Sequence, residues 1–460
     1  MKETIKSTQR KALICIVLSC AISIVWGSFI AAGSYAGLGD LKAVFYATRC
    51  LMEHNDPYNP SVLLRVYEAD GNRFPSDPAE ALLFRVGMLR CVNLPTSLLL
   101  MAPLALLPWS VAGKVWMVVS AALLSLAALL VWTVAKDRAP RAATILICFM
   151  LCNVELIFAL GNLAGIAVSF CIFAVWCFLE ERYVHAGILC LAIGLALKPH
   201  DAGLVWFYFL LAGGVYRKRA LQTLGVVAVL ALPAILWVSQ VSPEWMQELH
   251  SNLLVGSAHG GLNDPGPDSL TIRSADSVIS LQSTFSLIRD DPRFYNLASY
   301  LICGSLLIAG AIRVLKSRFS KENAWFALAA IAALSMLPVY HRAHDAKLLL
   351  LTVPACSSLW AESGRLKWLA GLITTCAVAC TADVPATILA MMMSRLGGGT
   401  SGVWEKVLMV LLHPAPLALL AAGIFYLWVY FRRTSEEKRG FVEAGESFGA
   451  AVAAISGASR

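Results

Sequence analysis

The sequence predicts an all-α polytopic membrane protein, and its composition is the first reason. Hydrophobic residues make up 58% of the 460 residues and charged residues only 14%, with a mean hydropathy of +0.69. Soluble domains carry about 25% charged residues. The second reason is the arrangement, in which long apolar stretches alternate with short charged clusters. Such stretches are stable in lipid as helices, because a helix satisfies its own backbone hydrogen bonds.

Clusters of basic residues separate the apolar stretches and give them a direction. Lysine and arginine next to a span favour the cytoplasmic side. If every cluster is cytoplasmic, the spans between the clusters must come in pairs. The clusters lie at Lys136, Arg138 and Arg141, at Arg182, at Arg217, Lys218 and Arg219, at Arg313, Lys316, Arg318 and Lys321, at Arg365 and Lys367, and at Arg432, Arg433, Lys438 and Arg439.

This pairing predicts about twelve transmembrane helices in a single domain over residues 1–435. The expected spans are residues 12–32, 109–135, 141–160, 163–180, 186–197, 201–215, 219–239, 296–316, 323–340, 346–362, 366–388 and 406–431. Three loops are then extracytoplasmic: a large first one over residues 33–108, and two more over 240–295 and 389–405. We expect residues 436–460, rich in small side chains, to form a disordered cytoplasmic tail.

One apolar stretch allows a second topology. Residues 94–107 are apolar but short and contain Pro95 and Pro103, so we interpret them as an interfacial or re-entrant helix on the outer side. The alternative lets this stretch cross the bilayer and joins residues 186–197 and 201–215 into one broken helix. Both versions have twelve spans. The charge rule favours the first, because the second places the cluster at Lys136 outside.

Charge and cysteine content exclude several classes of function. The net charge of +8 does not indicate a nucleic-acid partner, because the basic residues sit at helix ends. Most of the thirteen cysteines lie within apolar stretches, where cysteine behaves as a small hydrophobe. Cys50 and Cys91 share one polar loop and can pair if that loop faces an oxidising compartment. No Cys/His spacing resembles a zinc site, so we expect neither a metal nor a cofactor.

The first candidate functional residue is Asp40, which follows the first span. It opens a stretch with helical apolar spacing, Asp40–Glu53, expected to be an interfacial helix. An aspartate at a helix start is commonly an N-cap, which is the structural interpretation. The functional interpretation is a carboxylate at the membrane surface that takes a proton from a hydroxyl group. Asp56 and Tyr58 follow in a turn-forming segment.

The second candidate is the polar turn between the spans 186–197 and 201–215, which contains Lys198 and His200. A lysine between two apolar stretches is costly unless it reaches water or an anion. It is either a lysine whose ammonium group extends to the interface or a cation for a phosphate group.

The third candidate is the crowded turn between residues 340 and 347. It contains His341, Arg342, His344, Asp345 and Lys347. If this turn is outside, its basic residues break the charge rule, and an anionic ligand is one cause for such an exception. A metal bound by His341 and His344 is the weaker alternative, because no further ligand set is evident.

A fourth candidate is the turn Gly161-Asn162, with Glu155 earlier in the same span. An acidic residue within a span indicates a functional site by default, although Glu155 can equally be a structural partner of a nearby cation. The loop 240–295 is rich in Gly, Ser and Asp and can cover an acceptor.

Taken together, these residues resemble glycosyltransferase family 87 of the GT-C superfamily. The resemblance rests on four segments in the order in which that family carries them: Gly39-Asp40-Leu41 with Phe45-Tyr46, Ala47, Arg49 and Asp56-Pro57-Tyr58; Gly161-Asn162; Leu197-Lys198-Pro199; and His344-Asp345 before the leucine-rich stretch 348–351. The chain departs from the family pattern at Leu41, where an aromatic residue is usual, at Leu163-Ala164, and at His200, where glutamine is usual.

The resemblance implies a GT-C-type fold and a metal-independent, inverting hexosyltransferase, usually a mannosyltransferase. The donor is a polyprenyl-phosphate sugar, and the acceptor is a lipid or glycan at the extracytoplasmic face of the inner membrane. The implied general base is Asp40, and the implied phosphate-binding residues are Lys198, His341, Arg342 and His344. The implied substrate-binding residues are Tyr46, Asp56, Tyr58, Asn162, His200 and Asp345.

Three other classes of function are compatible with many spans. A transporter or flippase of lipid-linked sugars needs several spans and a few intramembrane charges, but the sequence shows no two similar halves. An O-antigen ligase or polymerase is also an outer-face enzyme with a large loop. A purely structural scaffold does not need the crowded turn at His341.

Overall fold

The computed structural model describes residues 2–33, 37–271, 274, 277–362, 364–396, 409–411 and 413–457. Across these residues the chain is helical, and the one β-contact is an isolated bridge between Val278 and Arg342. The first half of the chain forms α1 (Lys2–Gly33), α2 (Gly39–Met52), α3 (Pro60–Ala69), α4 (Pro78–Leu83), the π-helix η1 (Phe84–Met88), α5 (Pro95–Ala105), α6 (Trp109–Ala135), α7 (Pro140–Leu151), α8 (Glu155–Leu160), α9 (Ala164–Leu179), α10 (Val184–Leu197) and α11 (Pro199–Ala212).

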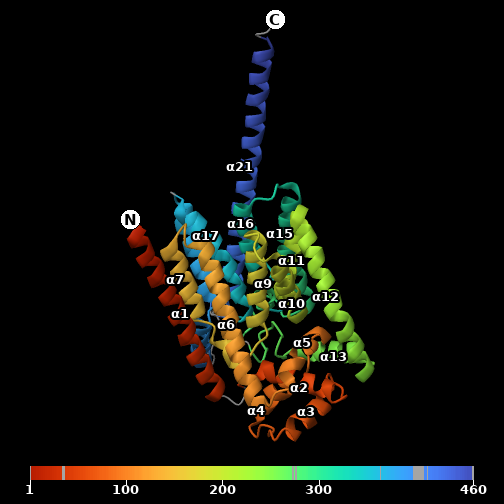
Figure 1. Cartoon of the computed structure of the whole chain (residues 1–460). Coiled ribbons are helices and arrows are strands. Elements are labelled where there is room, and N and C mark those ends of the chain that lie inside the picture. The colour runs from red at the N-terminus through yellow and green to blue at the C-terminus, as the bar shows by residue number, and fades with distance from the viewer. Residues whose placement is uncertain are drawn as a thin grey trace.

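The second half of the described chain is also helical. Its elements are α12 (Gly214–Val241), α13 (Trp245–Ser257), α14 (Leu281–Ser286), α15 (Pro292–Lys316), α16 (Lys321–Leu334), the 3-10 helix η2 (Asp345–Leu351), α17 (Thr352–Ala361), α18 (Leu366–Cys380), α19 (Asp383–Leu396) and α21 (Ala415–Gly457). The long helices run roughly side by side (Figure 1).

The chain is an all-α polytopic membrane protein. Six stretches are long and apolar enough to cross a membrane by length and composition: Ser7–Phe29, Trp109–Ala135, Pro140–Leu160, Gly214–Val241, Pro292–Lys316 and Ala415–Glu437. A seventh arises if α18 and α19, bent by 63°, form one span. These seven coincide with seven of the twelve expected spans.

The other five expected spans coincide with helices that are shorter than a full crossing. They are α9, α10, α11, α16, and η2 followed by α17. Length and composition alone therefore identify six or seven crossings among the described residues. Helices α9 and α16, two of the shorter ones, are buried among other helices along nearly their whole length. Short or broken helices are tolerated at membrane depth where protein surrounds them.

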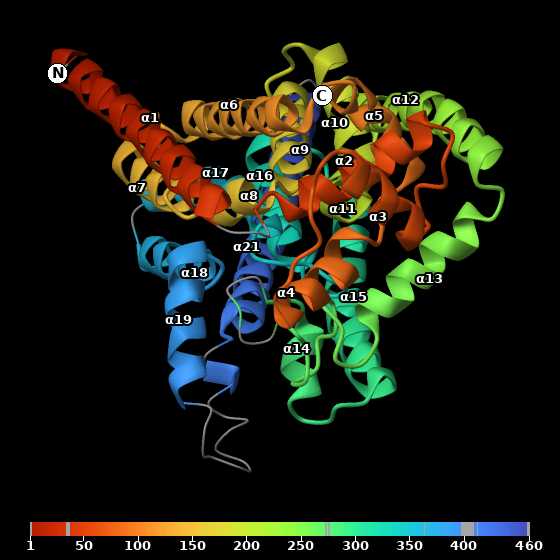
Figure 2. The same cartoon turned by 90° about the horizontal axis from the view of Figure 1, so that it is seen from below.

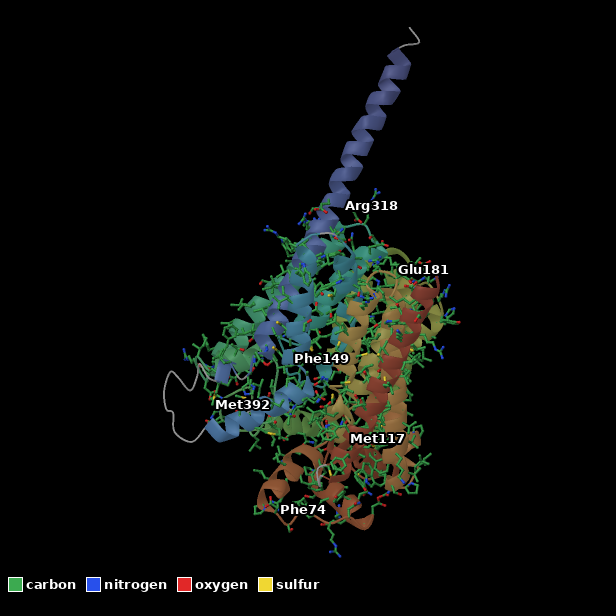
Figure 3. The ribbon with its side chains drawn as sticks, turned by 90° about the vertical axis from the view of Figure 1, so that its left-hand side faces the viewer. Phe74, Met117, Phe149, Glu181, Arg318 and Met392 are labelled. Carbon is green, nitrogen blue, oxygen red and sulfur yellow. The ribbon has the colours of Figure 1, made fainter. Side chains whose placement is uncertain are left out.

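The two ends of the bundle differ in what they carry. Both chain termini lie at the same end (Figure 1). Figure 3 places Glu181 and Arg318 near that end and Phe74 at the opposite one. Basic turns therefore lie at the end with the termini, as the charge pattern predicted. The first large loop lies at the other end.

The first large loop, residues 37–108, folds into a compact cap. Seen from below, α2, α3 and α4 lie across the ends of the bundle helices (Figure 2). Helix α2 is mostly buried rather than interfacial, and Phe45, Tyr46 and Tyr67 pack in a separate hydrophobic core. Arg49 pairs with Asp70 at 2.9 Å, tying α2 to the turn after α3. In the same core Cys50 and Cys91 are buried thiols without a disulfide.

Helix α5 corresponds to the apolar stretch with two possible topologies. It lies beside α2 at the end with the cap (Figure 1). The hydroxyl of Thr96 donates to Ala196 O at 2.6 Å, and that of Ser97 donates to Leu197 O at 3.1 Å. The last carbonyls of a helix have no partner within it. Helix α5 therefore satisfies the C-terminal carbonyls of α10.

Two expectations about the rest of the chain have different outcomes. Helix α21 continues to Gly457, so residues 436–457 of the expected tail are helical, and residues 458–460 lie outside the described residues. The expected loop 389–405 falls largely outside the described residues, since α19 occupies its start up to Leu396 and residues 397–408 are not described. The loop 240–295 contains α13 and α14.

Candidate functional site

The turn after α8 brings two distant segments together. Gly161 ends α8 with φ +66°, the left-handed region that favours glycine. A Cβ on Gly161 would lie 2.7 Å from Cβ of Leu41, so only glycine allows α8 to end this close to α2. The amide of Leu38 also donates to Ala159 O at 2.7 Å. These contacts set the start of α2, and with it Asp40, against the turn that carries Asn162.

Asp40 lies in the first turn of α2 and is not its N-cap. The N-cap is Leu38, in the left-handed conformation, and it makes no side-chain capping bond. The structural interpretation from sequence is therefore wrong for Asp40. Its Oδ2 accepts a hydrogen bond of 2.5 Å from Nδ2 of Asn162.

Asn162 connects Asp40 to the second candidate, Lys198. Its Oδ1 accepts from the amide of Ala164 at 2.8 Å and lies 3.5 Å from Nζ of Lys198. A side-chain amide has a donor end and an acceptor end, and here they face a carboxylate and an ammonium group. Asn162 thus lies between a potential base and a cation.

Lys198 occupies the break between α10 and α11. Pro199 starts α11, and its ring excludes continuation of α10 through this point. The ammonium group forms an ion pair with Oδ1 of Asp345 and lies 3.6 Å from Oδ2 of Asp201. Both carboxylate side chains are only 1% exposed. One ammonium group therefore faces two buried carboxylates.

The Lys198 and Asp345 groups lie in turns outside the expected spans. Burial alone lowers the pKa of Lys198, but Asp201 and Asp345 more than offset it and raise this pKa above its ordinary value. Burial alone raises the pKa of Asp345, but Lys198 and then His344 hold it well below its usual range. The pair is therefore ionised on both sides at neutral pH.

The crowded turn before η2 surrounds these carboxylates. The amide of Arg342 donates to Oδ2 of Asp345 at 2.9 Å, and Nε2 of His344 lies 3.5 Å from Oδ1 of Asp345. His341 faces the other carboxylate, with its Nε2 3.4 Å from Oδ1 of Asp201. His341 and His344 are buried.

The sequence of the chain matches a known protein family. The family model of glycosyltransferase family 87 matches residues 92–340, which is more than half of the chain. The chain belongs to glycosyltransferase family 87. It is therefore a membrane glycosyltransferase. No curated protein and no solved structure matches it significantly.

The matched range divides the candidate residues of this family 87 protein. Asn162, Lys198 and His200 lie within residues 92–340, whereas Asp40 precedes the range and His341 follows it directly. The family assignment thus does not depend on Asp40. Its proximity to Asn162 in space is an observation of the structure alone.

Some residues expected at the site of the glycosyltransferase lie elsewhere. The guanidinium group of Arg342 donates to Leu262 O at 2.8 Å and Asn263 Oδ1 at 3.1 Å, while its Nε contacts the Tyr340 hydroxyl. Arg342 therefore holds the loop that follows α13. Its backbone amide, at the start of η2, donates to Asp345.

The three candidates in the cap also make structural contacts. The Tyr46 hydroxyl donates to Asp70 at 3.0 Å, and the Tyr58 hydroxyl donates to the carbonyl of Asn93 at 2.9 Å. Asp56 accepts from the amide of Tyr58 at 2.9 Å, which is the turn expected from sequence. None of these three contacts involves Asp40, Asn162 or Lys198. They stabilise the cap.

Two features near the site escaped the sequence analysis. Asp201 joins Lys198, His200 and His341, although in the sequence it is only the first residue of the expected span 201–215. Its spacing of three residues from Lys198 in a new helix is the available signal. Lys347 pairs with buried Asp383 at 2.9 Å, and no local pattern reveals this because the two residues are far apart in sequence.

Glu155 belongs to this second group of charges. It is 5% exposed, and Asp383 accepts a hydrogen bond of 2.8 Å from the next amide, that of Leu156. This location favours the structural alternative for Glu155, beside the Lys347 pair.

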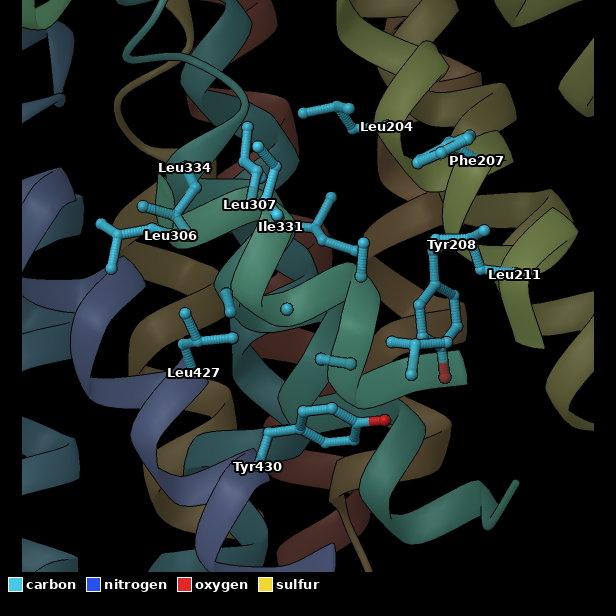
Figure 4. A pocket seen from close by; sticks show the side chains of 16 residues that line it. Leu204, Phe207, Tyr208, Leu211, Leu306, Leu307, Ile331, Leu334, Leu427 and Tyr430 are labelled. Atoms are coloured by element: carbon cyan, nitrogen blue, oxygen red, sulfur yellow. The ribbon is translucent and has the colours of Figure 1, made fainter. Parts of the chain in front are cut away.

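An apolar cavity of about 150 Å³ lies apart from these charges. It is lined by side chains of α11, α15, α16 and α21, and Figure 4 shows Tyr208, Leu306, Ile331 and Tyr430 around it. It shares α11 with the Lys198 turn but contains none of the candidate residues.

Proposed function

We propose that this family 87 glycosyltransferase transfers a hexose, by resemblance mannose, from a polyprenyl-phosphate donor to a lipid or glycan acceptor. The reaction takes place at the extracytoplasmic face of the inner membrane. The observation that carries this proposal is the chain of contacts from Asp40 through Asn162 to Lys198. It supports the proposal because the two ends of one amide contact Asp40, the proposed base, and Lys198, the proposed cation for the departing phosphate.

In the proposed reaction, Asp40 takes the proton of the acceptor hydroxyl as its oxygen attacks the anomeric carbon. The new glycosidic bond forms with inversion as the bond to the phosphate oxygen breaks. Polyprenyl phosphate departs with the bonding electron pair. Lys198, held between Asp345 and Asp201, stabilises the charge that develops on the phosphate.

His344 and His341 contribute through the two carboxylates that hold Lys198. Each faces one of them, at 3.5 Å from Asp345 and 3.4 Å from Asp201. Arg342 has a different proposed role, since its guanidinium group holds the loop after α13 over this end of the bundle.

The test uses membranes that contain the full chain, incubated with labelled polyprenyl-phosphate mannose and with the corresponding glucose donor. We expect labelled product from one of these donors, and no product from Asp40→Asn. Asp70→Asn is the matched control, because Asp70 is an aspartate of the cap that pairs with Arg49. Full activity of Asp40→Asn would remove Asp40 from the mechanism. Donor movement across the bilayer without a transferred sugar would favour a flippase instead.

A further inference from the structure

A carboxylate and two imidazole rings converge beneath Lys198. Oδ1 of Asp201 lies 3.4 Å from Nε2 of His341 and 3.7 Å from Nε2 of His200, and the three groups offer ligand atoms within 4.8 Å of one another. Asp201 and His341 are each only 1% exposed. None of these facing atoms has a hydrogen-bond partner in the described chain. Buried polar atoms of this kind are rare without a partner.

The separations fit a bound ion better than direct hydrogen bonds. Both exceed the 3.2 Å limit of an ordinary N–H···O bond. Around a tetrahedral zinc ion with bonds of about 2.0–2.1 Å, neighbouring ligand atoms lie about 3.3–3.4 Å apart. The observed distances of 3.4 and 3.7 Å need only a small contraction to reach that geometry.

The ring of His341 is also oriented for a metal. Its Nδ1 lies 3.2 Å from the carbonyl of Val339, so that nitrogen carries the proton and donates it. In the neutral ring, Nε2 then directs its lone pair toward Asp201. A carboxylate cannot accept that lone pair. Histidines that bind metals usually donate their other ring nitrogen to a carbonyl or carboxylate in this way.

The charged groups around Asp201 also favour a bound cation. The Lys198 ammonium group contacts two carboxylates, Asp345 and Asp201. A divalent ion at Asp201 would add positive charge directly beside this buried carboxylate.

We propose that His200 Nε2, Asp201 Oδ1 and His341 Nε2 form a binding site for a divalent transition-metal ion, of which zinc fits the donor set best. Three protein ligands of this type leave a fourth position open, the arrangement of catalytic rather than structural zinc. Local sequence patterns do not predict this site, so no metal was expected, because the ligands come from two segments that no local spacing connects. The site stands independently of the donor and the reaction proposed above.

The test measures metal on the full-length protein purified in detergent. The protein is stripped with a chelator, reloaded with Zn²⁺, freed of unbound ion, and analysed by mass spectrometry of metals. We expect one zinc per chain. We expect His200→Ala to bind zinc at least roughly 100-fold more weakly, since even loss of an outer-shell partner costs about 10–100-fold. His200 is suited to replacement because its side chain is 35% exposed.

A second histidine–aspartate group supplies the matched control. His259, Asp268 and Asp290 also offer ligand atoms within 4.8 Å of one another, but the side chain of His259 is 65% exposed. We expect His259→Ala to keep the zinc. Loss of zinc in His259→Ala but not in His200→Ala would overturn the proposal, and so would a wild-type protein that retains none.

Loss of zinc in the alanine variant could also result from misfolding. A variant that gains a spectroscopic signal avoids this ambiguity. In Co²⁺-loaded His200→Cys, a thiolate ligand replaces an imidazole, and we expect a cobalt–thiolate charge-transfer band that Co²⁺-loaded wild type lacks. Identical spectra of the two proteins would show that residue 200 does not contact the ion. Because these readouts require no sugar transfer, failure of the proposed reaction and failure of the metal site are distinguished.

Discussion

The side-chain amide of Asn162 donates a hydrogen bond of 2.5 Å to the carboxylate of Asp40 across 122 positions of sequence. This contact joins the cap to the bundle and orients the proposed base. A hydrogen bond to a charged group contributes about 1.5–3 kcal/mol.

Asn162→Ala should therefore lower the rate of sugar transfer roughly 10- to 150-fold, the equivalent of about 1.5–3 kcal/mol. The measurement is the initial rate with saturating labelled donor, normalised to the amount of protein in the membrane. Asn72→Ala is the control, because Asn72 donates to the Tyr46 hydroxyl within the cap. Equal rates for the two variants would show that orientation by Asn162 is unimportant.

Lys198→Met should abolish transfer and also destabilise the protein, because it leaves Asp345 and Asp201 buried without their cation. Breaking a buried ion pair costs about 3–5 kcal/mol. The double variant Lys198→Met/Asp345→Asn separates the two effects. We expect it to recover much of the thermal stability in detergent while transfer stays lost. Recovery of transfer together with stability would make Lys198 purely structural.

Lys347 and Asp383 form a second buried pair, at 2.9 Å with side chains 5% and 0% exposed. Lys347→Met should lower the free energy of unfolding by about 3–5 kcal/mol, and Lys347→Met/Asp383→Asn by less. Thermal unfolding in detergent measures both. Arg432→Ala is the control, since Arg432 pairs with Glu436 at the surface and such pairs contribute about 0.3–0.5 kcal/mol. A similar shift for Lys347→Met and Arg432→Ala would contradict the assignment.

The proposed sidedness is tested by labelling single cysteines from outside intact cells. The background has the exposed native residues Cys15 and Cys376 replaced by alanine. A membrane-impermeant maleimide should label Glu53→Cys in the cap and His259→Cys in the outer loop. It should leave Glu181→Cys and Lys218→Cys unlabelled until the membrane is opened. The reverse pattern would place the Asp40 end in the cytoplasm.

Sequence patterns predicted the helices well because apolar length and basic clusters act locally. All twelve expected ranges contain helix, and Asp40, Asn162, Lys198 and Asp345 do come together. The pattern did not show that five of the twelve ranges contain helices shorter than a full crossing, or that a helix such as α9 is surrounded by protein. A buried segment and a lipid-facing one have the same composition.

The directions in which the side chains of the site point could not be predicted from the sequence. Arg342 and His341 are neighbours in the sequence, yet one faces the loop after α13 and the other faces Asp201. Irregular backbone in the turn before η2 sets these directions, and no periodicity describes it. Asp201 was missed for the related reason that its partners come from two segments far apart in the sequence.

The two hydroxyl groups of α5 that cover the end of α10 have a mechanical consequence. If α5 moved away, Ala196 O and Leu197 O would lose the hydrogen bonds that Thr96 and Ser97 donate. Each buried carbonyl left unsatisfied costs about 1–3 kcal/mol. The cap and the Lys198 turn are thereby coupled, because any movement that separates them also leaves two helix-terminal carbonyls without their partners.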